Sequence, residues 1–285
     1  MRGYWIGLLL AGLLPVAAAA DDALPRARAW VQQALGAELR GGGDLNRIAS
    51  LAFPLATDAR ATGDAGSRAL LGALARHLAG LDVAGLDCAQ LPDVVLAGGF
   101  VRDAGEAVDV AAAERRLANC QFGSALFDTA NALVFACRYA GWDPVVRLPG
   151  SLSRLVAAQR ADGAFVAENG RASYYLSSHA VLAVHWCGGD PAVVARGAAY
   201  LRAGLVPFRD RGFNDGLAES LIFLRWLGAE APDRESHLAA LRARIRPDGG
   251  LCFVEQPGCS SHWHATSLLL ELLLERGGFA PGAAP

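Results

Sequence analysis

The sequence predicts an all-α protein, an α/α toroid in which about five or six helical hairpins form a ring with inner and outer helix layers. Three observations predict this fold class. Apolar residues recur at three- and four-residue spacings, glycines end these stretches at similar intervals, and one unit near the C-terminal end occurs twice with matching parts. The first pattern is typical of amphipathic helices, and the other two indicate stacked helical units.

The helical spacing covers most of the chain and leaves no convincing strand. A further helix is expected to include 93–97. The segments with helical spacing are 28–39, 45–56, 67–81, 107–119, 124–139, 151–159, 174–186, 191–203, 215–227, 235–245 and 263–275.

Four glycines mark the ends of apolar helices. Gly141, Gly188, Gly228 and Gly277 are 47, 40 and 49 residues apart. Glycine is the preferred residue just after a helix, because it adopts the left-handed conformation that ends one. A period of about 45 residues that holds two helices predicts stacked hairpins. The second helix of each pair is the more apolar and is therefore assigned to the inner ring.

The N-terminal end has the pattern of a secretory signal peptide. Arg2 gives a small positive region, 5–14 is apolar, and Ala18, Ala19 and Ala20 form a cleavage site of small residues. Such a run is too short for a membrane span. We therefore expect a signal peptide over 1–20, one toroid domain over 21–278, a flexible tail over 279–285, and a periplasmic or secreted protein without a membrane span.

Composition excludes several function classes. The mature chain is mildly acidic, which gives no basic stripe for nucleic acid. All 26 basic residues are arginine, so no lysine is present to form a Schiff base or to bind phosphates in a P-loop. No cofactor is expected.

The duplicated unit carries a resemblance to a known family. A turn at Gln159–Phe165 precedes an apolar helix that begins near Ser177, and a second turn at Arg246–Leu251 precedes one that begins near His262. The first turn resembles the repeat of squalene-hopene cyclases and protein prenyltransferase β subunits, and 249–266 is similar to a prenyltransferase stretch. The resemblance implies a terpenoid cyclase/prenyltransferase toroid and a prenyl or terpenoid ligand. The cyclases' Asp-x-Asp-Asp acid is absent, and so is the Asp and Cys pair of the prenyltransferase zinc set at the start of the helix from Tyr175.

Alignment of the inner helices on their terminal glycines places polar residues at one mouth of the ring. These residues fall at two levels along the helices, about one helical turn apart. Residues four apart, such as Asp215 and Glu219, lie on the same face of their helix. We expect catalytic roles for His179, Asp215, Glu219 and His264, because imidazoles and buried carboxylates act as acids and bases near neutral pH. We expect ligand contacts from Asp128, Tyr175, His262 and Trp263. Asn131 lies at the deeper level. Asp215 also fits a simple helix N-cap, and Trp186 and Trp226 lie at helix ends, where packing explains them.

Six cysteines lie in the mature chain, and an even number in an exported protein indicates disulfides. Cys252 and Cys259 flank a short loop and are expected to pair. Cys137 and Cys187 lie near the ends of neighbouring inner helices, where they either pair or pack as small apolar residues. The spacing of Cys252, Cys259, His262 and His264 fits no common zinc motif, and no metal is expected.

Three function classes remain from the sequence, which leaves open whether the protein is an enzyme. The first is an exported toroid that binds a small or apolar ligand in its central cavity, with acid/base chemistry at the ring mouth. The second is a secreted helical-barrel glycan lyase or hydrolase. The third is a non-catalytic binding or scaffold toroid.

Overall fold

The computed structural model describes residues 22–120 and 125–274, and every structural statement below concerns these residues. The expected signal peptide over 1–20, the tail over 279–285 and Gly277 lie outside the described residues.

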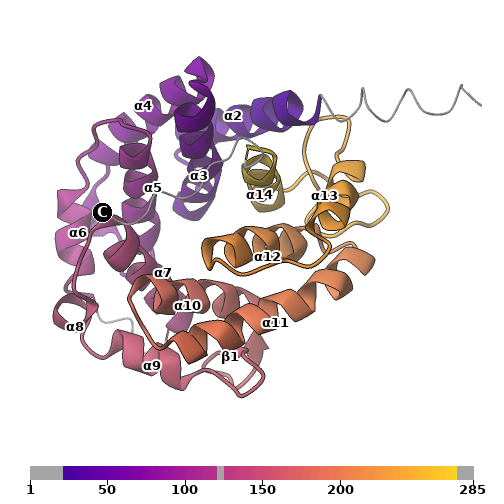
Figure 1. The fold of residues 1–285 in the computed structure, drawn as a ribbon. Coiled ribbons are helices and arrows are strands. Elements are labelled where there is room, and N and C mark those ends of the chain that lie inside the picture. Colours follow the sequence, from indigo (N-terminus) through magenta and orange to yellow (C-terminus); the bar gives the residue numbers. More distant parts are fainter. Residues whose placement is uncertain (1–21, 121–124, 275–285) are drawn as a thin grey trace, which may run out of the picture.

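Inner helices form a closed ring in the described part of the chain (Figure 1). Each packs against the next, and the last packs against the first. In ring order they are α3 (Leu45–Thr62), α5 (Leu91–Asp103), α7 (Leu126–Val134), α10 (Tyr174–Trp186), α12 (Asn214–Trp226) and α14 (Trp263–Leu274).

An outer layer of helices surrounds this ring, and each outer helix packs against one or two inner helices. Its members are α2 (Ala23–Gly41), α4 (Ala65–Ala79), α6 (Ala111–Leu117), α9 (Ser151–Ala157), α11 (Pro191–Asp210) and α13 (Arg234–Ala243). Short turns η1 (Val83–Gly85) and α8 (Pro144–Arg147) connect the layers, and the π-helical turn η2 (Phe135–Tyr139) continues α7. The predicted all-α toroid with two helix layers is confirmed.

Three of the glycines that were predicted to end helices do so in the structure. Gly141, Gly188 and Gly228 have φ angles of 61°, 68° and 65°, the left-handed conformation that ends a helix. The predicted inner helices are also the more buried ones. Every residue of α12 from Asn214 to Leu224 is buried, whereas α13 buries three.

The two Asp-Gly turns have matching geometry. In each, the Asp side chain accepts a hydrogen bond from the backbone N–H two residues on, at 3.1 Å for Asp162 and 3.0 Å for Asp248. The following glycines, Gly163 and Gly249, have φ angles of 89° and 90°. A Cβ atom at either one would collide with a backbone carbonyl of an outer helix, so both the angle and the space require glycine.

One element was not predicted. Strands β1 (Phe165–Val166) and β2 (Ala172–Ser173) form an antiparallel hairpin that leads into α10. Each strand has two residues, which is too short for the alternating pattern that identifies a strand in a sequence.

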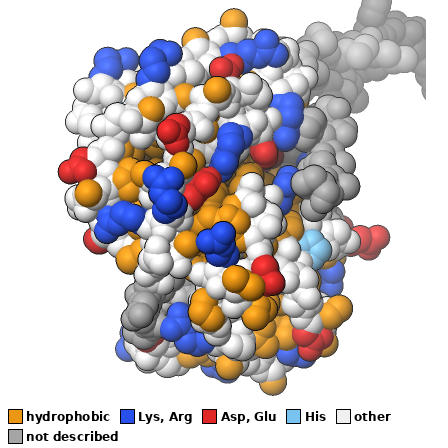
Figure 2. Space-filling view, turned by 90° about the vertical axis from the view of Figure 1, so that its left-hand side faces the viewer, with side chains coloured by type: hydrophobic (Ala, Val, Ile, Leu, Met, Phe, Trp, Pro, Cys, Tyr) orange, Lys and Arg blue, Asp and Glu red, His pale blue; other side chains and the backbone are white. Residues whose placement is uncertain are grey.

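Three disulfides link the described residues, namely Cys88–Cys120, Cys137–Cys187 and Cys252–Cys259. The predicted Cys252–Cys259 pair is confirmed, and Cys137 and Cys187 pair rather than pack as free thiols. Among the helices described, none combines the length and apolarity that crossing a bilayer would require. On the face in Figure 2, the described arginine and acidic side chains are interspersed.

Candidate functional site

The ring encloses a cavity of about 340 Å³. This volume lies at the lower end of the range for small-molecule sites, roughly 300–1,000 Å³. Inner helices supply most of the wall, and the loop before α14 supplies the rest. Ten of the 23 lining residues are Phe, Tyr or Trp: Phe53, Phe100, Phe127, Tyr139, Tyr175, Trp186, Phe223, Trp226, Phe253 and Trp263.

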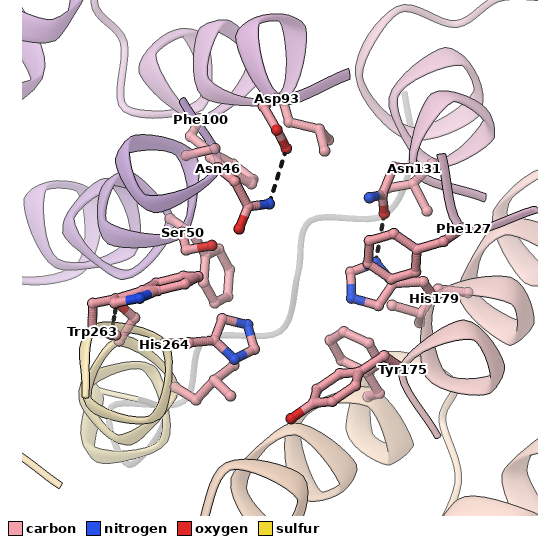
Figure 3. Close-up of a pocket in the computed structure, with 18 of the residues that line it drawn as sticks. Asn46, Ser50, Asp93, Phe100, Phe127, Asn131, Tyr175, His179, Trp263 and His264 are labelled. Carbon is pink, nitrogen blue, oxygen red and sulfur yellow. Dashed lines mark hydrogen bonds between the residues drawn. The ribbon is translucent and has the colours of Figure 1, made fainter. Parts of the chain in front are cut away.

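The cavity has an apolar end and a polar end. Residues in the middle and at the C-terminal ends of the inner helices form an aromatic cluster, in which Trp226 stacks on Phe223 at 5.3 Å and meets Phe53 edge-on at 5.4 Å between ring centroids. The first turns of α3, α5, α10 and α14 supply Asn46, Asp93, Tyr175 and His264 to the other end (Figure 3). The inner helices therefore run in the same direction, and a ligand would meet polar groups at one end.

A buried carboxylate anchors this polar end. Asp215, in the first turn of α12, is fully buried. Its Oδ1 lies 2.7 Å from Nδ1 of His264, and its Oδ2 accepts a hydrogen bond of 2.6 Å from the Tyr175 hydroxyl. Asp215 thus fixes two residues that line the cavity without lining it itself.

The loop closed by Cys252–Cys259 holds the start of α12. The backbone N–H of Asp215 donates to the carbonyl of Phe253 at 3.3 Å, and the side chain of Asn214 donates to the carbonyl of Cys252 at 3.1 Å. The side chain of Asp215 caps no helix: Phe213 occupies the N-cap position of α12. The N-cap interpretation of Asp215 is therefore wrong, because both of its oxygens bond to side chains from other helices.

The surroundings of His264 favour its protonated form. Burial lowers the pKa of its imidazole, but the hydrogen bond and negative charge of Asp215, with the charge of Glu219, outweigh burial and raise it above the usual value. Because Nδ1 faces Asp215, Nε2 is the ring nitrogen available to the cavity.

His179 has the opposite environment on the other side of the cavity (Figure 3). Its Nδ1 lies 2.6 Å from Oδ1 of Asn131, so Nδ1 carries the hydrogen and Nε2 keeps its lone pair. Phe127 and Phe223 flank the ring at centroid distances of 4.8 and 5.6 Å. Burial, together with the charge of His264, lowers the pKa of His179 to about 3, so this imidazole is neutral at physiological pH.

Glu219 lies one turn beyond Asp215 on α12 and is fully buried. Burial raises its pKa to about 8, because the charge of His264 and a contact with Ser178 offset burial only in part, and Asp215 opposes them. Neither carboxylate oxygen has a hydrogen-bond partner within the described residues.

A second polar pair lies near the mouth, between α3 and α5. The side-chain amide of Asn46 donates to Asp93 at 3.2 Å. Burial raises the pKa of Asp93 to about 6; the Asn46 hydrogen bond lowers it, while the charges of Asp44 and Asp128 add to the rise. Sequence reasoning missed this pair, although both residues lie in the first turns of inner helices, the position that identified His264 and Tyr175.

Two groups of side chains have the spacing of metal ligands in the described residues. Asp215, Glu219 and His264 offer atoms within 4.8 Å of one another. A cation there would have to replace the hydrogen bond between Asp215 and His264. Cys252, Glu255 and Cys259 form the other group, but its two cysteines are joined as a disulfide and offer no thiolate.

The structure brings most of the sequence-predicted site residues together. Asp215, Glu219, His264 and Tyr175 form one cluster, and His179, His262 and Trp263 line the same cavity. Asp128 is not part of the cavity wall. Burial and the charges of Asp87 and Glu168 raise its pKa. Trp186 and Trp226 line the cavity, so packing alone does not explain them.

Comparison with known proteins shows which solved structure has a similar fold. No protein-family profile matches the sequence, and no curated protein matches it either. Among solved structures, the chain is similar to the apo form of a variant of the type II terpene cyclase MstE from Scytonema. The TM-score is 0.62 at 14% sequence identity, over 93% of this chain and 99% of that chain. The chain therefore has a terpenoid-cyclase-like α/α toroid fold.

Proposed function

We propose that this protein binds an apolar small molecule in its central cavity and transfers protons at the polar end of that molecule, with His264 as acid and His179 as base. One observation carries the proposal. Two imidazoles reach the same cavity from opposite walls, and their surroundings shift their pKa values in opposite directions. Titratable groups whose environments push their pKa values apart are the usual acid and base of a site.

The aromatic wall supports the apolar part of the proposal. Burial of apolar surface contributes about 25 cal/mol per Å², and the faces of Trp and Phe also attract positive charge. The similarity to a type II terpene cyclase supports an unsaturated, terpenoid-like ligand. A glycan would need hydrogen-bonding groups along its whole length, whereas the polar side chains of this wall lie mainly in the first two turns of the inner helices.

The geometry suits a redox-neutral reaction. His264 would donate its Nε2 proton to an oxygen of the ligand, such as a carbonyl or epoxide oxygen. His179 would take a proton from a carbon of the same ligand through its free Nε2. The two transfers balance, and the product is an isomer or a ring-closed form of the substrate. An imidazolium held by Asp215 is a weak acid, which favours an oxygen over an unactivated double bond as the acceptor.

Asp215 and Tyr175 support this chemistry without touching the ligand's reacting atoms in the proposed scheme. Asp215 holds His264 in one orientation and stabilises its charge. Tyr175 donates its hydroxyl to the second oxygen of Asp215. The carboxylate therefore has a fixed position, as a supporting group in a catalytic site requires.

Binding can be tested with an environment-sensitive apolar fluorophore that competes with linear isoprenoid alcohols and aldehydes. Ser50 lines the cavity, so the side chain of Ser50→Trp would occupy part of its volume, and fluorophore binding is expected to weaken at least tenfold. Ser153→Trp makes the same change on the exposed surface of α9 and is the matched control. Equal binding by both variants would contradict a ligand site in the cavity.

Chemistry can be tested without knowing the product. The same isoprenoid aldehydes are incubated with the protein in D₂O, and deuterium uptake is measured by mass spectrometry. His264→Gln and His179→Gln are each expected to reduce uptake by about 10²–10⁴-fold, with little change in fluorophore binding. If the fluorophore binds but no deuterium is taken up, the protein binds a ligand without transferring protons, and the proposed acid/base chemistry is refuted.

We further propose that the protein is exported. The three disulfides of the described residues support an oxidising compartment. Expression of the full chain in a bacterium, followed by mass measurement of the periplasmic product, tests this. A product that begins at residue 21 is expected, and an uncleaved cytoplasmic product would refute it.

A further inference from the structure

The burial of Glu219 is not explained by any hydrogen bond to its carboxylate in the described residues. It is 0% exposed, and both of its oxygens are without a hydrogen-bond partner in the described residues. Burial of an ionised, unpaired carboxylate is costly, so buried carboxylates are normally paired. Two nearby hydroxyls bond elsewhere, since Ser178 donates to the carbonyl of Tyr175 and Tyr174 donates to that of Gly216.

The position of Glu219 places it beside the proposed acid. It follows Asp215 by four residues on α12, so both project from the same face of that helix. Its carboxylate, that of Asp215 and the ring of His264 offer atoms within 4.8 Å of one another. Asp215 and Glu219 are fully buried and the His264 side chain is 21% exposed, so water screens the two carboxylates from one another poorly.

We infer that Glu219 is a positioning residue that holds a proton at neutral pH and thereby controls how readily His264 releases its own. The inference rests on the proposed function of His264 as the acid. It extends that function by naming what regulates the acid.

Charge balance is the first argument. Asp215 and a protonated His264 cancel one another's charge across a 2.7 Å hydrogen bond. A second carboxylate in the same buried space has no remaining counter-charge, and two carboxylates so close do not both ionise easily. Burial accordingly raises the pKa of Glu219 to about 8.

The other groups that face Glu219 do not supply a counter-charge. They are the phenols of Tyr174 and Tyr175 on α10, besides Asp215 on its own helix and His264 on α14. Burial raises the pKa of both phenols, and the charge of Glu219 adds to that rise, so both stay neutral.

The consequence concerns the strength of the acid. With Glu219 neutral, Asp215 is the anion that holds the proton on His264. Once Glu219 ionises, a second anion holds that proton, and the pKa of His264 rises further. His264 is therefore the stronger acid while Glu219 keeps its proton.

The test is an NMR titration of the full chain, labelled with ¹³C and ¹⁵N, without ligand. The Glu219 carboxyl carbon is expected to titrate near pH 8, and the ring nitrogens of His264 are expected to report the same step. In Glu219→Gln that step disappears, because the variant has no group that ionises at this position. Glu271→Gln, which changes a buried carboxyl farther along α14, is the matched control and is expected to keep the step.

Two results would overturn the inference. One is a Glu219 carboxyl that titrates near its ordinary value of 4.5 in the wild type, which decides the matter even if no variant folds. The other is a step near pH 8 in the ring nitrogens of His264 that persists in Glu219→Gln or, if that variant does not fold, in Glu219→Leu. Because the titration needs no ligand, failure of the deuterium experiment alone counts against the proposed reaction and not against this charge relationship.

Discussion

His264 and Asp215 form a hydrogen-bonded pair whose two halves differ in exposure. Nδ1 of His264 lies 2.7 Å from Oδ1 of Asp215, the carboxylate is fully buried, and the imidazole side chain is 21% exposed. The carboxylate therefore belongs to the core, while the imidazole can meet a ligand. The buried Asp215 can therefore stabilise the protonated form of His264 through Nδ1 while Nε2 faces the cavity.

Replacement of Asp215 should change stability in a pH-dependent way. The pKa of His264 is raised in the fold, so its protonation stabilises the fold fully below about pH 6.5, and this contribution is lost as the pH rises through the folded-state value. Asp215→Asn removes the cause of that rise. The loss in free energy of unfolding, measured by urea denaturation, should be largest below about pH 6.5 and smaller at alkaline pH.

The control for this prediction is Asp190→Asn. Asp190 is the exposed N-cap of α11, and Asn caps a helix about as well as Asp. Its effect should be small at every pH. A loss in Asp215→Asn that is the same at all pH values would mean that a lost hydrogen bond, and not the charge on His264, accounts for it.

The levels of the polar residues could be predicted from the sequence, but their partners could not. Alignment on Gly141, Gly188, Gly228 and Gly277 placed Asn131 level with His179, and Asp215 level with His264, because helices that end at one level also begin at one level. Which residue bonds to which depends on ring radius and helix rotation. These follow from the packing of the whole ring, which no local pattern contains.

Helix α5 shows why part of the wall was missed. Gly98 and Gly99 lie in its middle, and glycine there lowers helix propensity, so only 93–97 was predicted as helical. The structure gives their reason: a Cβ at Gly98 would lie 2.9 Å from the side chain of Val110, and one at Gly99 would lie 2.9 Å from that of Tyr139. Close packing against α6 and against the end of the neighbouring inner helix thus looked like a break in the sequence, and Asp93 and Phe100 went unassigned.

The disulfides should differ in their contribution to stability. They close 50, 32 and 7 residues for Cys137–Cys187, Cys88–Cys120 and Cys252–Cys259. Loop-closure entropy predicts contributions of about 4.1, 3.7 and 2.4 kcal/mol in that order. Paired Cys→Ala variants, compared by urea denaturation, check the ranking. If the pair at 252 and 259 proved the most important, its contacts with the start of α12 would outweigh the entropy of the unfolded chain.

Loss of the buried ion pair between α2 and α3 should lower the free energy of unfolding more than loss of a surface ion pair. Arg28 donates from two nitrogens to the fully buried carboxylate of Asp58, at 2.8 and 2.7 Å, and Ser67 adds a hydrogen bond of 2.7 Å. Asp58→Ala should destabilise the fold by about 3 kcal/mol, because Arg28 and Ser67 are left unpaired.

Glu38→Ala is the matched comparison for Asp58. Glu38 pairs with Arg47 at 3.5 Å near the surface, where ion pairs contribute about 0–1 kcal/mol. Thermal denaturation of the two variants should separate them clearly. Similar losses would show that the Asp58 network is relaxed by neighbouring groups or water.

The protonation state of His179 can be changed by one substitution. Asn131→Asp places a carboxylate against Nδ1 of His179, the arrangement that Asp215 provides for His264. The pKa of His179, about 3 in the wild type, should then rise because the imidazolium gains a counter-charge. At neutral pH, Nε2 should carry a proton and lose its capacity as a base. Ring ¹⁵N shifts measure the change directly, and deuterium uptake should fall and then recover as the pH is raised above the new value. Asn131→Leu, which adds no charge, should leave the ring neutral. If both variants lost uptake at every pH, the role of Asn131 would be to position His179 and not to set its charge.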